Sequence, residues 1–228
     1  MTLARRLSAE GLGSLLLATA VIGSGIMGER LADGNAAIAL LANTAATVAA
    51  LGVLIAVLGR VSAHFNPAVS LVMLILRRIS LPEAALYTLV QVSGCCLGAI
   101  LAHAMFELPL LQASGHARTG ISQWVGEIVA TFGLVLVILG ASRVRLPWLV
   151  AAWIGGAYWF TSSTSFANPA ISVARSITDT FAGIRPADVP GFIVAQLLGA
   201  LLAIVAARVL FSTGRVTTPT VGGEGGTF

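Results

Sequence analysis

The sequence feature that most constrains the fold is the triplet Asn-Pro-Ala, which occurs twice. Asparagine is a favoured helix N-cap, and proline suits the first helical turn, where its missing N–H is not needed. Each triplet opens a short apolar stretch, so the sequence predicts helices over residues 66–76 and 168–178 that are too short to cross a bilayer. A single Asn-Pro is typical of an ordinary turn, whereas two copies in matching context indicate a common role. The two copies comprise Asn66, Pro67 and Ala68, and Asn168, Pro169 and Ala170.

The composition is that of a membrane protein with several spans. Of the 228 residues, 57% are hydrophobic and 10% are charged. A bilayer-crossing helix needs about 20 residues, so six spans and two half-helices nearly use up the chain. We predict an all-α membrane protein with spans over residues 12–27, 36–58, 82–106, 123–141, 147–161 and 190–211. The first apolar run also fits a signal peptide, but Glu10 at its start favours a retained span.

The two halves of the chain match. Glu10 and Glu127 each stand thirteen residues before a glycine, and Gln91 and Gln196 each stand three residues before one. Three spans per half is an odd number, so the second half enters the membrane in the opposite direction. Such inverted repeats place their functional site at the midplane between the halves. We therefore expect one integral membrane domain of two repeats, 1–112 and 113–211, followed by a Gly- and Thr-rich tail, 212–228, that is disordered.

The charged residues indicate topology rather than a charged partner. All thirteen basic residues are arginine, and nine of them fall on one side of the predicted spans. We expect the protein to lie in the inner (plasma) membrane. The positive-inside rule then places both of its termini in the cytoplasm. No basic run is interleaved with aromatic residues, so a nucleic-acid partner is not indicated. The adjacent Cys95 and Cys96 indicate buried packing, and we expect no metal site and no cofactor.

The paired triplets, the glutamates of the first and fourth spans and the inverted repeat resemble the aquaporin and glycerol-facilitator family, also called major intrinsic proteins, over essentially the whole chain. The resemblance implies a six-helix bundle with two re-entrant half-helices, a homotetramer with one pore per protomer, and passive conduction of small uncharged solutes rather than enzymatic activity. It also implies that Asn66 and Asn168 donate hydrogen bonds to the solute. Backbone carbonyls of the stretches before the triplets should line the pore, namely those of Ala63, His64, Phe65, Phe166 and Ala167.

Two buried carboxylates need partners. A carboxylate in the middle of a membrane helix costs roughly 2.5–3.5 kcal/mol on insertion scales. We expect Glu10 and Glu127 to brace the re-entrant loops by accepting hydrogen bonds from their N–H groups. The alternative, a proton relay, needs further ionisable residues in the spans, and His64 and His103 are the candidates. His64 is more typical of a residue that positions its loop than of a ligand or a pH switch.

The outer constriction departs from the family pattern. Family spacing, counted from the triplets, assigns Ala46, Gly156, Ser165 and Ile171 to this selectivity filter, with a slip of one residue open for the first two. Most members of the family carry arginine where this chain has Ile171, and the nearest arginine here is Arg175. The resemblance therefore implies a wide filter without an arginine or any other charge.

The same filter, together with the runs at residues 172–175 and 178–184, resembles bacterial aquaglyceroporins of arsenic-resistance operons. That implies conduction of arsenite or methylated arsenic acids besides glycerol and water. A water or glycerol channel without an arsenic role is the first alternative, and a non-conducting membrane scaffold is the second. A membrane enzyme needs a nucleophile–base pair or a metal-ligand cluster within the spans, and none is evident.

Overall fold

The computed structural model describes residues 1–211, and within them all regular structure is helical. The predicted fold class, an all-α bundle with two half-helices, is confirmed. The tail over residues 212–228, expected to be disordered, lies outside the described residues. The elements are α1 (Leu3–Leu31), α2 (Ala36–Leu58), α3 (Pro67–Ile75), α4 (Leu81–Met105), α5 (Ile121–Gly140), α6 (Leu146–Phe160), α7 (Pro169–Arg175), the 3₁₀ helix η1 (Pro186–Asp188) and α8 (Val189–Phe211).

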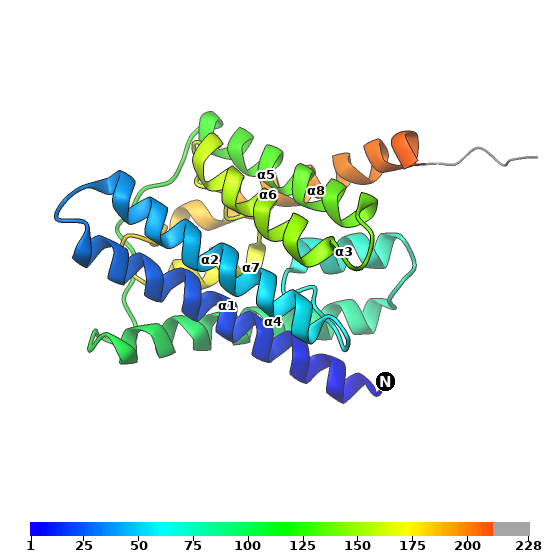
Figure 1. The fold of residues 1–228 in the computed structure, drawn as a ribbon, viewed down its shortest axis with the longest axis horizontal. Helices are drawn as coiled ribbons and strands as arrows, with labels where there is room; N and C mark the ends of the chain where they lie inside the picture. The colour runs from blue at the N-terminus through cyan, green and yellow to red at the C-terminus, as the bar shows by residue number, and fades with distance from the viewer. Residues whose placement is uncertain (212–228) are drawn as a thin grey trace, which may run out of the picture.

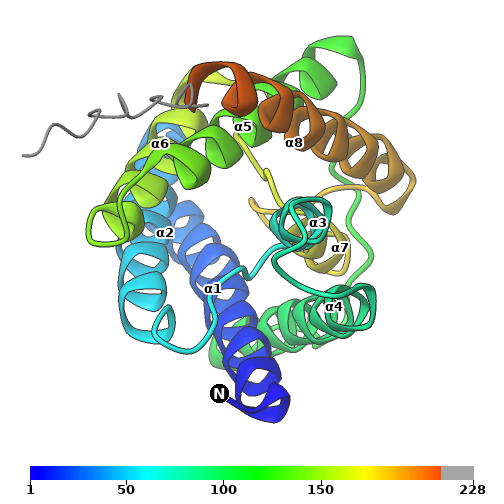
Figure 2. The same ribbon diagram turned by 90° about the vertical axis from the view of Figure 1, so that its right-hand side faces the viewer.

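The long helices surround the two short ones. Seen from one end, α1, α2, α4, α5, α6 and α8 form a ring, and α3 and α7 lie inside it (Figure 2). Helix α1 packs on α4 and α2, and α5 packs on α8 and α6, while α2 and α6 join the two halves. Both short helices pack against α4 and α8. The start of α1 and the end of α8 lie at the same end of the bundle (Figure 1), as an even number of crossings requires.

Five of the described helices are long and apolar enough to cross a membrane: α1, α2, α4, α5 and α8. Helix α6 has 15 residues and is shorter, because proline at its start and the re-entrant loop after Thr161 leave fewer residues for it. Helix α1 extends beyond the predicted 12–27 at both ends, since its polar first and last turns continue the helix outside the apolar run.

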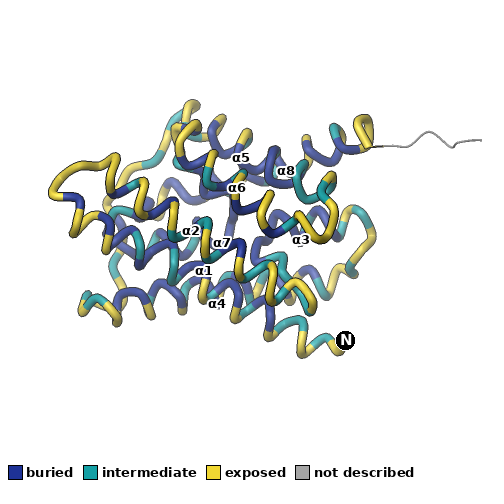
Figure 3. The backbone as a smooth tube through the Cα atoms, in the orientation of Figure 1, coloured by how far each residue is buried: buried dark blue, intermediate teal, exposed yellow. Residues whose placement is uncertain are grey.

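The burial pattern is that of a protein surrounded by lipid. Buried residues line the inside of the ring, and exposed residues follow the outer faces of the helices (Figure 3). Large apolar side chains are among the exposed ones, including Leu89, Val205 and Trp159. In a bilayer this exterior contacts acyl chains, so it needs no protein cover.

Two of the four glycines that mark the two halves are helix-crossing points. A Cβ on Gly94 of α4 would lie 2.5 Å from the carbonyl oxygen of Gly11 in α1. A Cβ on Gly199 of α8 would lie 2.4 Å from the carbonyl oxygen of Ile128 in α5. Close backbone approach through small residues is the usual way in which membrane helices pack. At these two crossings α1 contacts α4, and α5 contacts α8, through their backbones.

Candidate functional site

Each Asn-Pro-Ala triplet starts one of the short helices. The Asn66 side chain accepts a hydrogen bond from the N–H of Ala68 at 2.9 Å, and the Asn168 side chain accepts one from the N–H of Ala170 at 3.0 Å. Pro67 and Pro169 occupy the first position of α3 and α7. The positive ends of both helix dipoles therefore lie at the triplets, in the interior of the bundle.

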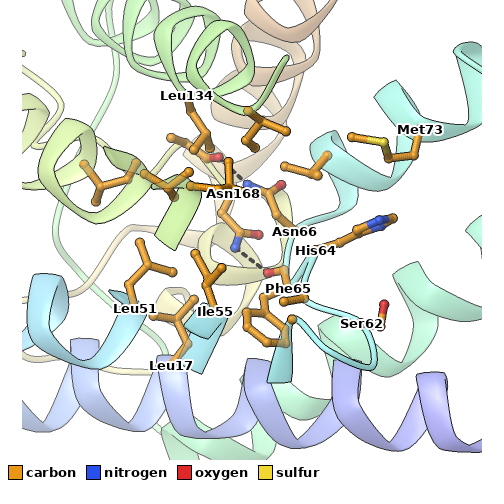
Figure 4. Close-up of a pocket in the computed structure, with 18 of the residues that line it drawn as sticks. Leu17, Leu51, Ile55, Ser62, His64, Phe65, Asn66, Met73, Leu134 and Asn168 are labelled. Atoms are coloured by element: carbon orange, nitrogen blue, oxygen red, sulfur yellow. Dashed lines mark hydrogen bonds between the residues drawn. The ribbon is translucent and has the colours of Figure 1, made fainter. Parts of the chain in front are cut away.

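The two triplets are joined by a reciprocal pair of hydrogen bonds. The Asn66 amide nitrogen donates to the carbonyl of Ala167 at 2.7 Å, and the Asn168 amide nitrogen donates to the carbonyl of Phe65 at 2.7 Å (Figure 4). Phe65 and Ala167 both have φ of 49°, a left-handed conformation that is costly for residues other than glycine. Each amide nitrogen has a second N–H, so each asparagine holds the opposite loop and has one further donor.

Glu10 lies beneath the first loop. Its carboxylate accepts hydrogen bonds from the N–H groups of His64 at 2.8 Å and Phe65 at 2.7 Å. The Gln91 amide of α4 donates both to Glu10 at 2.8 Å and to the Ser70 hydroxyl of α3 at 3.0 Å. The carboxylate is fully buried, so these donors supply the partners that a charge in the membrane interior requires.

Glu127 repeats this arrangement in the second half. It accepts hydrogen bonds from the N–H groups of Phe166 and Ala167, both at 2.8 Å. The Gln196 amide of α8 donates to Glu127 at 2.6 Å and to the Ser172 hydroxyl of α7 at 2.9 Å. A glutamate, a glutamine and a serine thus make the same contacts in both halves. In the sequence, Gln91 and Gln196 were noticed only because each stands three residues before a glycine, and this spacing did not indicate their contacts with the glutamates.

A cavity of about 570 Å³ runs past both triplets. It is lined by both asparagines, by the loops that precede them, and by inward faces of α1, α2, α5 and α6 (Figure 4). The predicted site residues in its wall are Ala63, His64, Phe65, Asn66, Ser165, Phe166, Ala167, Asn168 and Ile171.

Two predicted filter residues are not among those that line the cavity. Ala46 is half-buried, and its neighbour Thr47 lines the wall instead. Gly156 is exposed on the outer face of α6, where an added Cβ would approach the Phe160 ring, and Tyr158 of α6 lines the wall. Counting back from the second triplet assumes a fixed length for the connection between α6 and α7. The counted residue, Gly156, is about half a helical turn from Tyr158, which faces the cavity. The sequence did not indicate Tyr158, because α6 is apolar on all sides and its pattern does not show which face turns toward the cavity.

The part of the cavity wall formed by Thr47, Tyr158, Ser165 and Ile171 is uncharged and carries hydroxyl groups. The Thr47 and Ser165 hydroxyl oxygens are buried and have no hydrogen-bond partner among residues 1–211. Tyr158 adds a phenol, and Ile171 provides an apolar side chain from α7. This constellation can exchange hydrogen bonds with a hydroxylated molecule on one side and contact its apolar part on another.

The other end of the cavity is basic and aromatic. Arg6, Arg78 and Arg143 line it, and Arg6 forms an ion pair with Glu83. The His64 ring contacts Tyr87 edge-on, with 5.2 Å between ring centroids. The arginines follow from the positive ends of the spans, whereas nothing in the sequence indicated the place of Tyr87.

Comparisons with known proteins agree with this geometry. The pattern that defines the family described as "Major intrinsic protein" matches residues 1–147. The chain is 52% identical over 217 residues to Aquaglyceroporin AqpS of Rhizobium meliloti (strain 1021), with 93% of each chain covered. It is 27% identical over 234 residues to Probable aquaporin AqpM of Archaeoglobus fulgidus, with 89% of this chain and 95% of that protein covered.

The fold is similar to a solved one. The crystal structure of the aquaglyceroporin from Plasmodium falciparum superposes with a TM-score of 0.70 at 17% identity, over 92% of this chain and 98% of that one. At this identity the likeness concerns the fold alone. With the family pattern and the relative at 52% identity, the chain belongs to the major intrinsic protein family, whose members are membrane channels and not enzymes.

Proposed function

We propose that this protein is an aquaglyceroporin that conducts water, glycerol and neutral arsenic hydroxy acids such as arsenite and methylated arsenicals. The observation that carries the proposal is the cavity that passes both asparagines and meets Thr47, Tyr158, Ser165 and Ile171 with no charged side chain among them. The relative at 52% identity bears the name aquaglyceroporin, which supports the same class of solute.

The wall chemistry fits small polyhydroxylated solutes. Glycerol and As(OH)3 are neutral at pH 7 and present several hydroxyl groups to their surroundings. Unpaired hydroxyls on Thr47 and Ser165 replace part of a solute's hydration shell, and Ile171 contacts its apolar side. A guanidinium at position 171 would fill this space and require its own partners, which is why its absence favours the larger solutes.

The centre of the pore performs the second selection. The remaining N–H groups of Asn66 and Asn168 donate to the solute, and the carbonyls of residues 63–65 and 166–167 accept from it. Two helix N-termini make this spot unfavourable for cations. An ion also has to give up water that a neutral solute does not hold as tightly.

The setting of the channel follows from its surface. The apolar exterior faces a lipid bilayer, and we propose a homotetramer in the plasma membrane with both termini in the cytoplasm. Most arginines of the described residues lie at the ends of helices near the start of α1, which the positive-inside rule assigns to the cytoplasm.

A swelling assay tests the function and sizes the filter. Purified protein in liposomes should conduct water, glycerol and arsenite, and should exclude sugars. Loss of the arsenite response alone would favour a water and glycerol channel without an arsenic role, and loss of all responses would favour a scaffold.

One pair of variants tests the assignment on α6. Tyr158→Ala should raise the flux of solutes larger than glycerol, because it removes a ring from the wall. Gly156→Ala is the matched control on the same helix, since its added methyl group points at the outward Phe160 and should leave fluxes unchanged. If Gly156→Ala changes the fluxes and Tyr158→Ala does not, Gly156 and not Tyr158 belongs to the filter.

A further inference from the structure

Two arginines lie behind the second re-entrant loop. Arg175 is the last residue of α7 and is 2% exposed. Its guanidinium stacks on the Phe166 ring, with Cζ 3.4 Å from the ring centroid, and its Nε donates to the carbonyl of Ala182. Arg118, from the α4–α5 connection, approaches the same ring with Cζ at 5.2 Å. Two positive charges therefore share one buried aromatic residue.

Neutral groups hold the Arg118 guanidinium in place, while the backbone N–H of Arg118 donates to the Asp188 carboxylate at 2.8 Å. Its Nε donates to the carbonyl of Gly183 at 2.8 Å, and its Nη1 lies 3.5 Å from both the Ser163 carbonyl and the Thr164 hydroxyl. Among residues 1–211, neither the Arg118 nor the Arg175 guanidinium forms an ion pair with a carboxylate. The positive charge of each is therefore not cancelled by a direct partner.

These charges lie one residue away from the pore wall. Arg118 contacts Thr164, and the next two residues, Ser165 and Phe166, line the cavity. Arg175 follows Ile171 by one helical turn. Neither arginine lines the cavity itself. A charge so placed acts on a solute through the loop without occupying the space the solute needs.

A purely structural role does not account for this pair. Burying a charge without a counter-ion is costly, and two like charges that face one ring repel each other. The positive-inside rule does not explain them either, because the α4–α5 connection lies at the end of the bundle opposite the start of α1 (Figure 1).

We propose that Arg118 and Arg175 exclude cations from the outer pore, and so perform from behind the loop the electrostatic role that position 171 leaves open. The inference rests on the proposed outer constriction at Ser165 and Ile171. A cation in the constriction meets two positive charges that no ion pair within the described residues neutralises, through a medium of low dielectric constant, whereas a neutral solute does not feel this repulsion. The channel can then have a wide filter and still not dissipate the cation gradients across the membrane.

The test measures cation leak and glycerol flux on the same proteoliposomes. Arg118→Gln should raise the potassium and proton leak by about tenfold, the scale that Coulomb's law gives for one unit charge about 12 Å away at an effective dielectric constant of about 20. Its glycerol flux should stay within about twofold, because the side chain does not line the cavity. Arg118→Lys should keep the leak low, since the charge is retained.

Matched variants make the outcome decisive. Arg60→Gln removes one charge from an exposed arginine after α2 and should change neither quantity. Arg175→Gln should raise the leak as Arg118→Gln does, and if it fails to fold, Arg118 alone carries the test. An unchanged leak in Arg118→Gln, with wild-type glycerol flux intact, overturns this inference and leaves the proposed function standing. Absence of glycerol flux in the wild type overturns the proposed function instead.

Discussion

Replacing Ile171 with arginine tests the filter most directly. Ile171 is 4% exposed, lies in the first turn of α7 and lines the cavity near Ser165. An arginine at this position adds volume, a fixed charge and five N–H donors. We expect flux of glycerol and arsenite to fall far more than flux of water, because water passes beside the new side chain and bonds to it.

The expected size of the effect follows from packing. Forcing extra atoms into an occupied space costs typically about 1–3 kcal/mol. Every 1.36 kcal/mol on a barrier changes a rate tenfold, so glycerol and arsenite flux should fall by about 5-fold to 150-fold. Water flux should fall by less than about threefold, and methylated arsenic acids, which are larger, should be affected most.

The new charge also has a cost for folding. It lies one helical turn from Arg175, where Cβ atoms are about 5–6 Å apart, so the two like charges repel each other and the variant should be less stable. Ile171→Met is the control that adds length without charge. Fluxes of water, glycerol and arsenite should be measured side by side in liposomes with matched densities of folded protein.

Two results would refute the reasoning about the filter. If arsenite and glycerol pass the Ile171→Arg channel as fast as the wild type, the side chain does not face the solute. If all three fluxes fall by the same factor while the folded amount is matched, the substitution blocks the channel as a whole, and no size selection occurs at this position.

The bracing contacts give two further predictions. Glu127→Gln places an amide NH2 against donors that now bond to a carboxylate, so the melting temperature in detergent should fall by the equivalent of about 1–3 kcal/mol; Glu29→Gln, at an exposed carboxylate that accepts one N–H bond, should change it little. Asn66→Ala removes a helix cap and the bond to the opposite loop, and it should destabilise the protein more than Asn35→Ala, which removes only the cap of α2. Equal losses in either pair would remove the special role given to the loop contacts.

Local chemistry made the helical framework predictable from the sequence. The apolar runs specify the long helices because a bilayer accepts few alternatives, and Asn66 and Asn168 specify the starts of α3 and α7 because capping is a contact within four residues. The matching positions of Glu10 and Glu127 follow from the repeat. Such features depend on residues close in sequence or on symmetry, and both can be recognised in a single chain.

Features that depend on rotation of a helix or on the path of a loop could not be predicted. Whether Gly156 or Tyr158 of α6 faces the cavity depends on how the connection to α7 is wound, which no pattern of apolar residues reports, since α6 is apolar on both faces. Arg118 lies in a connection without regular structure, and its contacts with residues 163–164 and 183 join segments at least 45 residues apart. The reciprocal bonds of Asn66 and Asn168 likewise span about a hundred residues.

The two halves make the same contacts at the centre of the bundle and different contacts toward its two ends. At the centre, each half presents a glutamate, a glutamine, a serine and an asparagine in the same contacts. Toward the ends the halves diverge: the first loop is flanked by His64 and Tyr87, and the second by Phe166 with its two arginines. Because the central contacts are the same in both halves, we expect differences in solute between related channels to arise in these outer layers. Substitutions there should change which solute passes while leaving the folded framework intact.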